Sequence, residues 1–152
     1  MRILFVCLGN ICRSPLADAV MRDLCVKNNL DWTIDSAGTS NYHIGEHPDK
    51  RAQKISQKFG VDSSYLKARQ FSVTDYDDFD VIYAMDQNNY NDIIRLARND
   101  SDSAKVKLFL NELEPGMNRG VRDPWFDDKL FEPVFVEIRE TCEVILFKYK
   151  SS

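Results

Sequence analysis

The sequence lacks long hydrophobic runs and an excess of basic residues. No apolar stretch is long enough to cross a bilayer, so we expect no contact with a membrane. Twenty Lys and Arg residues stand against 24 Asp and Glu residues, which gives a net charge of −4. Nucleic-acid-binding proteins usually carry a basic face, so we expect no nucleic-acid partner. An anionic substrate is still allowed, because a local site can be positive on an acidic protein.

Histidine is also scarce. The two histidines, His43 and His47, stand four residues apart with no clear third ligand, so we expect no metal site. No signal-peptide pattern follows Met1, and a chain of this size does not need disulfides in order to fold. We therefore expect a cytoplasmic protein with four reduced cysteines and no cofactor.

The sequence shows no repeats, and strand and helix signals alternate along it instead. Strand-like apolar runs stand at residues 3–6, 32–36, 79–85 and 106–110. Helical patterns of apolar residues begin near residues 14, 48, 90 and 133. A long loop is expected at residues 111–128, before the last helix. This alternation predicts a single-domain α/β fold over residues 1–152, with three layers in which helices flank a four-stranded parallel sheet.

The segment between the first strand and the first helix carries the chemistry. Cys7 stands at the carboxyl end of the strand, where parallel sheets bind ligands. Ser14 is predicted to cap the helix and Pro15 to be its first residue. Backbone N–H groups of such a loop can converge on a tetrahedral anion. The predicted phosphate-binding residues are Leu8, Gly9, Asn10, Ile11, Cys12, Arg13 and Ser14.

Within this loop, Arg13 and Cys7 have distinct predicted roles. The guanidinium of Arg13 can hold two phosphate oxygens at once. A helix N-terminus and a nearby cation favour the ionised thiol, so Cys7 is positioned to attack phosphorus. Gly9 and Asn10 tolerate unusual backbone angles. A lone cysteine is more often a buried apolar residue, but the place of this pair between a strand and a helix favours function.

The segment FVCLGNICRSPLA at residues 5–17 resembles the phosphate-binding loop of the low molecular weight protein tyrosine phosphatases. Further matching segments follow in the family's order: DSAGTS, HPDKRA, ARQ, FDVIYAMD and RDPWF. The resemblance implies metal-independent hydrolysis of phosphotyrosine and aryl phosphomonoesters through a phosphocysteine. It also implies phosphotyrosine proteins as substrates, and it leaves open a cognate tyrosine kinase and whether the protein is a monomer or a weak dimer.

The resemblance gives roles to residues outside the loop. Asp123, before Pro124, is the expected general acid, although Asp-Pro alone more often begins a turn. Tyr42, Trp125 and Phe126 are the expected walls of a slot for an aromatic ring, with ordinary loop packing as the alternative for Phe126. Many family members carry two tyrosines after Asp-Pro, and both are absent here.

A supporting network and a redox pair are also implied. Asn10, Ser14 and Ser36 are expected to hold the loop in shape, although Leu66 stands where the family often has a histidine. Cys12 is expected to form a reversible disulfide with Cys7 under oxidising conditions, while Cys25 and Cys142 are expected in the core. Asp86, at the end of the third strand, either assists the site or caps the next helix.

Three other functions are compatible with the same loop. An arsenate reductase of the same fold would need further cysteines to relay a disulfide outward. A phosphoarginine phosphatase would use the same nucleophile. A non-catalytic phosphate-binding module would need neither Cys7 nor Asp123, so the presence of both residues favours an enzyme.

Overall fold

The structure is a computed structural model that describes residues 1–151, and a sheet of four parallel strands lies at its centre. The strand order is β2-β1-β3-β4. The strands are β1 (Arg2–Cys7), β2 (Thr33–Gly38), β3 (Val81–Ala84) and β4 (Val106–Leu108). The helices are α1 (Arg13–Lys27), α2 (Lys50–Lys58), α3 (Asp75–Asp78), α4 (Gln87–Ile94), α5 (Asp100–Ala104) and α6 (Phe131–Lys150). The predicted α/β fold and parallel sheet are confirmed.

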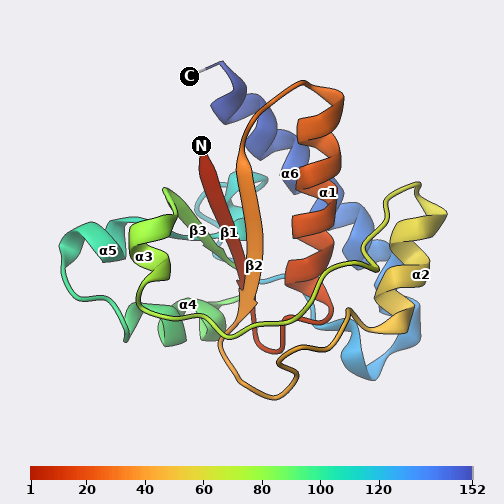
Figure 1. Cartoon of the computed structure of the whole chain (residues 1–152), viewed down its shortest axis with the longest axis horizontal. Helices are drawn as coiled ribbons and strands as arrows, with labels where there is room; N and C mark the ends of the chain where they lie inside the picture. Colours follow the sequence, from red (N-terminus) through yellow and green to blue (C-terminus); the bar gives the residue numbers. More distant parts are fainter. Residues whose placement is uncertain (152) are drawn as a thin grey trace.

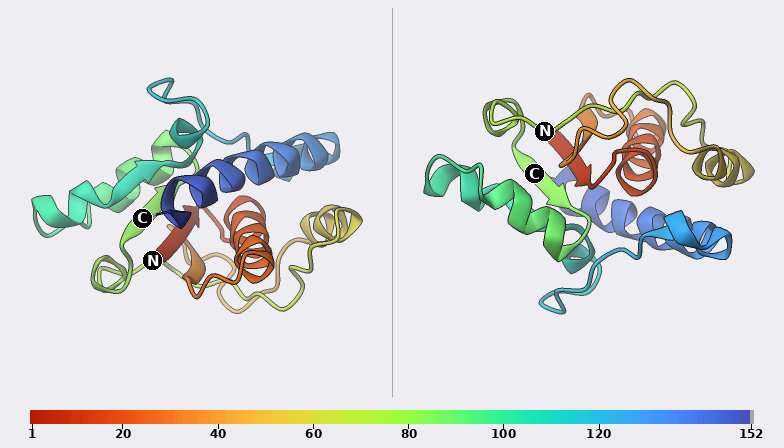
Figure 2. Two further views of the ribbon diagram at one scale, coloured as in Figure 1. Left: turned by 90° about the horizontal axis from the view of Figure 1, so that it is seen from above. Right: turned by 90° about the horizontal axis from the view of Figure 1, so that it is seen from below.

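Helices cover both faces of the sheet and make three layers (Figures 1 and 2). Helices α1, α2 and α6 lie on one face, and α3, α4 and α5 lie on the other. Strand β1 is buried on both sides because its side chains alternate between two apolar clusters. Ile3 and Phe5 face the cluster under α1 and α6, while Leu4 and Val6 face the cluster under α4. No helix within residues 1–151 has both the length and the apolar character that a bilayer crossing requires.

The carboxyl ends of the strands meet at one edge of the sheet, at the bottom of Figure 1. The loop from β1 to α1 lies there beside the end of β2, and Gly38 pairs with Gln70 in an isolated parallel bridge. Consequently, residues that are far apart in the sequence converge on the loop that follows Cys7.

Three local predictions need correction. Helix α1 begins at Arg13 with Cys12 at the cap position, so neither Ser14 nor Pro15 has its predicted place. The fourth strand ends at Leu108, because residues 109–112 turn into a 3-10 helix. Helices α3 and α5 were not predicted, since their short sequences are dominated by Asp and Ser and carry no apolar stripe.

Candidate active site

The sulfur of Cys7 lies at the floor of a cleft, at the carboxyl end of β1. Asn10 donates its backbone N–H to Cys7 Sγ at 3.3 Å. The loop can turn back in this way because Asn10 has a φ of 57°, in the left-handed region that asparagine tolerates. Gly9, in contrast, does not have a positive φ, so the loop does not use the unusual backbone angles that glycine tolerates.

Ser14 supports the sulfur rather than the helix end. Its hydroxyl oxygen lies 3.0 Å from Cys7 Sγ and accepts a hydrogen bond from Asn10 Nδ2 at 2.8 Å. The Ser14 hydroxyl has two acceptors for its own proton, the sulfur at 3.0 Å and the carbonyl of Ala37 at 3.5 Å, and the sulfur is the nearer of the two. A hydroxyl and a backbone N–H can therefore both stabilise negative charge on Cys7.

The loop is held from outside by the main chain of the segment around Arg69. Asn10 Oδ1 accepts the backbone N–H of Arg69 at 3.0 Å, and the Arg69 side chain is fixed by ion pairs with Asp35 and Asp75. Leu66, where the family often has a histidine, is buried in the apolar cluster under α1 and α6 and offers no hydrogen-bonding side chain. A backbone amide therefore provides the support for Asn10.

Ser36 does not join this network, which corrects the prediction from the sequence. Its hydroxyl donates to Asp18 Oδ2 at 2.8 Å, and Asp18 pairs with Arg22 on the same helix. The β1–β2 register explains the difference, because it places Ser36 opposite Phe5, two residues before the strand end that carries Cys7. Ser36 therefore donates a hydrogen bond to a buried carboxylate of α1.

Arg13 is almost fully buried and is fixed on two sides. Its Nη1 donates to Asp86 Oδ2 at 2.7 Å and to the carbonyl of Val121 at 3.0 Å. Burial opposes the charge, but Cys7, Asp86 and Asp123 together raise the pKa of the guanidinium above its ordinary value. Its orientation is therefore set before any ligand arrives.

Asp86 fills both of the roles considered for it. One carboxylate oxygen accepts from Arg13, and the other accepts the backbone N–H of Asn89 and caps α4. The Asp86 side chain therefore both caps α4 and fixes Arg13.

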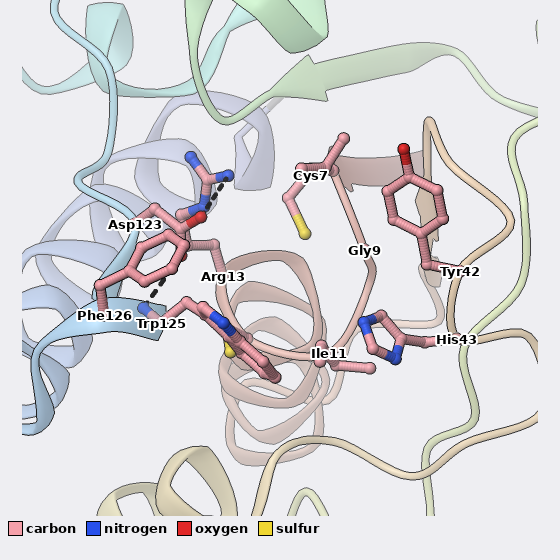
Figure 3. A pocket seen from close by; sticks show the side chains of 11 residues that line it. Cys7, Gly9, Ile11, Arg13, Tyr42, His43, Asp123, Trp125 and Phe126 are labelled. Carbon is pink, nitrogen blue, oxygen red and sulfur yellow. Dashed lines mark hydrogen bonds and ion pairs between the residues drawn. The ribbon is translucent and has the colours of Figure 1, made fainter.

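Asp123 lies at the rim of the cleft, on the loop before α6. One carboxylate oxygen accepts the backbone N–H of Trp125 at 3.1 Å, and the other lies 3.8 Å from Arg13 Nη2 (Figure 3). Its backbone is extended, as a following proline favours. With 41% of its side chain exposed, Asp123 can exchange protons with a ligand or with water.

The cleft has a volume of about 250 Å³ and its walls are mostly apolar or aromatic. Tyr42 stands on one side of Cys7, while Trp125 and Phe126 stand on the other (Figure 3). Ile11 contributes to the lining between them. A slot of this size and character suits a single flat side chain.

His43 also lines the cleft, which the sequence did not reveal. Its Nδ1 lies 2.9 Å from Glu46 Oε2, and its ring centroid lies 6.0 Å from that of Trp125. The other histidine, His47, bonds the carbonyl of Leu66. Only the spatial neighbourhood identifies His43 as a wall residue, because its spacing from His47 carries no such signal.

The four cysteines are all unpaired in the structure. Burial, together with the nearby charges of Asp49, Cys7 and Asp123, raises the pKa of the Cys12 thiol well above its ordinary value. Cys12 is thus a neutral neighbour of the site, and its disulfide with Cys7 stays a prediction. Cys25 and Cys142 are buried, as expected.

Gly38 lets the loop between β1 and α1 pack closely on the end of β2. A Cβ atom at this position would lie 2.8 Å from the backbone oxygen of Leu8 and 3.2 Å from the backbone nitrogen of Asn10. Backbone atoms cannot move aside as the end of a flexible side chain can, so the loop itself would have to shift.

We expect Gly38→Ala to lower the free energy of unfolding by about 1–3 kcal/mol, because of this overpacking. It should also weaken the binding of inorganic phosphate, measured as competitive inhibition. Gly116→Ala is the control, since Gly116 has a φ of 76° with no atom near its missing Cβ. That variant should lose stability but keep its phosphate affinity, and equal phosphate affinity in the two variants would contradict the role of Gly38.

Comparisons with known proteins agree with this geometry. The family described as "Low molecular weight phosphotyrosine protein phosphatase" matches residues 2–151. A protein of that name from Gallus gallus is 40% identical over 150 residues, covering 96% of this chain and 94% of the relative. "Low molecular weight protein-tyrosine-phosphatase YfkJ" from Bacillus subtilis is 40% identical over 146 residues, covering 95% and 92%. The crystal structure of DARP, a Drosophila arginine phosphatase, is 35% identical and superimposes with a TM-score of 0.91 over 100% of this chain and 99% of its own.

Proposed function

The chain belongs to the low molecular weight phosphotyrosine protein phosphatase family, and from this premise we propose that it hydrolyses phosphotyrosine in proteins through a phosphocysteine on Cys7. The observation that carries the proposal is the setting of the Cys7 sulfur. It accepts a backbone N–H of a strand-to-helix loop, contacts the Ser14 hydroxyl and lies beside a buried arginine. This setting favours both a thiolate and a bound phosphate.

In the first step the thiolate of Cys7 attacks phosphorus from the floor of the cleft. A sulfur–phosphorus bond forms while the bond from phosphorus to the tyrosine oxygen breaks. Loop N–H groups and Arg13 hold the non-bridging oxygens of the transferring group. Asp123 gives its proton to the departing phenolate oxygen, so tyrosine leaves as a neutral phenol.

In the second step the same carboxylate acts as a base. Asp123 takes a proton from a water molecule, and the oxygen of that water attacks phosphorus. The sulfur–phosphorus bond breaks, inorganic phosphate leaves, and Cys7 returns to the thiolate. The exposure of Asp123 supports this exchange of roles, because water can reach the side chain directly.

The rival functions fit the site less well. A thiol relay of the arsenate reductase type would have to reach Cys25 or Cys142, and both are buried in the core. A phosphoarginine side chain would bring a guanidinium between walls that include Ile11 and Trp125. Among the described residues that line the cleft, Asp123 is the only carboxylate available to balance that charge.

We expect the purified protein to release phosphate from a phosphotyrosine peptide in the presence of EDTA. The kcat/KM for that peptide should exceed the value for free phosphoarginine by about two- to tenfold, because aromatic packing contributes about 0.5–1.5 kcal/mol beyond the area that is buried. The measurement is phosphate release at matched concentrations of the two substrates. A parallel assay measures arsenate reduction by this protein with thioredoxin as the reductant. A higher kcat/KM for phosphoarginine, or turnover of arsenate alone, would overturn the proposed substrate.

A further inference from the structure

We propose that Arg51 is a positioning residue that holds the loop carrying Asp123 at a fixed place above the phosphate loop. The inference rests on the proposed function, because the position of Asp123 matters for turnover only if Asp123 moves the proton. It adds to that function a residue that lies outside the set of groups that touch the substrate.

Arg51 reaches from the first turn of α2 to the segment that follows Asp123. Its Nη1 donates to the carbonyl of Trp125 at 3.0 Å and to Asp128 Oδ1 at 2.5 Å. Its guanidinium carbon lies 5.3 Å from the ring centroid of Trp125 and 4.7 Å from that of Phe131. One side chain therefore binds this loop through a carbonyl, a carboxylate and the ring of Trp125, and it also contacts Phe131 at the start of α6.

The other side of the guanidinium is tied to the phosphate loop through Asp49. Nε and Nη2 of Arg51 each bond a different carboxylate oxygen of Asp49 at 3.0 Å. The backbone N–H of Asp49 in turn donates to the carbonyl of Ile11 at 2.8 Å. A short path of contacts thus runs from Ile11 through Asp49 and Arg51 to the loop that bears Asp123.

The loop is held by the main chain of Val121, before Asp123, and by the buried Pro124, whereas Asp123 and the residues from Trp125 to Leu130 lie further out. Asp123 and Trp125 are each about two-fifths exposed, and the segment consists of two 3-10 turns outside the sheet. The carboxylate of Asp123 lies 3.8 Å from Arg13, too far for a hydrogen bond. A shift of about 1 Å in a reacting group can lower a rate about 10²-fold, so a small movement of the loop would reach the chemistry.

The test compares two substrates that differ only in their leaving group. For Arg51→Gln, kcat/KM for phenyl phosphate should fall about tenfold, whereas kcat/KM for 4-nitrophenyl phosphate should fall less than about threefold. The inhibition constant of inorganic phosphate should stay the same, because Arg51 does not line the cleft that contains Cys7. Arg51→Lys should recover part of the loss, since lysine keeps the charge and the contact with the rings but lacks the planar fork.

Arg98→Gln is the matched control. Arg98 also bonds two carboxylates, Asp77 and Asp102, and it lies in the segment that joins α4 to α5. Its substitution should leave both kcat/KM values unchanged, although it costs stability. A second measurement follows the loop itself: in a Trp32→Phe background, Arg51→Gln should increase the quenching of Trp125 fluorescence by acrylamide.

Each outcome bears on the inference. The positioning role would be overturned if Arg51→Gln lowered kcat/KM for both substrates by the same factor. It would also be overturned if neither kcat/KM nor the quenching of Trp125 changed, or if Arg51→Lys recovered none of the loss. The proposed function is tested separately by the wild-type protein and by Asp123→Ala. If the wild type hydrolyses both substrates and Asp123→Ala slows phenyl phosphate selectively while Arg51→Gln changes nothing, only the role of Arg51 fails.

Discussion

Replacing Cys7 by serine is expected to reduce kcat for aryl phosphates by at least about 10⁴-fold, since the reaction loses the nucleophile on which both steps depend. Inorganic phosphate should still bind with an affinity within about threefold of the wild type, because the loop N–H groups and Arg13 remain in place. Stopped assays of phosphate release give the first quantity, and isothermal titration with phosphate gives the second.

The control for this experiment is Cys25→Ser. Cys25 is also a buried thiol, but it lies near the far end of α1 from the cleft. Turnover in that variant should persist, with a modest loss of stability from burying a hydroxyl. Full activity in Cys7→Ser would exclude Cys7 as the nucleophile, and loss of activity in both variants would point to unfolding instead.

Replacing Asp123 by alanine should affect substrates unequally. We expect kcat/KM for phenyl phosphate to fall about 10²–10³-fold, because a poor leaving group needs the proton, while that for 4-nitrophenyl phosphate should fall far less. A plot of log kcat/KM against leaving-group acidity should therefore become steeper. Hydrolysis of the phosphocysteine should slow as well, which would appear as a burst of 4-nitrophenol release, because that leaving group departs without the proton from Asp123.

Asp127→Ala is the matched control for Asp123→Ala. Asp127 belongs to the same loop and accepts the backbone N–H of Lys129, just as Asp123 accepts that of Trp125. Its loss should disturb the local turn without changing the dependence on the leaving group. The assignment of Asp123 as the general acid would be wrong if Asp123→Ala lowered kcat/KM for both substrates by the same factor.

Much of this architecture follows from patterns in the sequence. The run at residues 3–6 is continuous and apolar because each of its residues contacts one of two buried clusters, so it predicts a central parallel strand. The position of Cys7 at the end of that run and of Arg13 at the start of a helix predicts the anion-binding loop. Asn10, expected to tolerate positive φ, is the residue that turns the loop.

Other features depend on contacts between distant residues, which periodicity does not encode. The partner of Ser36 is a buried aspartate 18 positions earlier in the chain, and the packing of α1 against β2 brings the two together. The role of Arg51 depends on a carbonyl 74 positions away. His43 joins the cleft through the shape of a loop, and its own type and spacing do not indicate this.

The two partners of Arg13 have a consequence for how the protein acquires activity. They lie 73 and 108 positions further along the chain, and α6, which packs against α1, follows both in the sequence. Contacts of such long range form late, because the entropy cost of closing a large loop comes before the free energy that the contact contributes. During synthesis on the ribosome, Arg13 is thus made 108 residues before the carbonyl that helps to hold it, so the site cannot take its final form until Val121 has emerged.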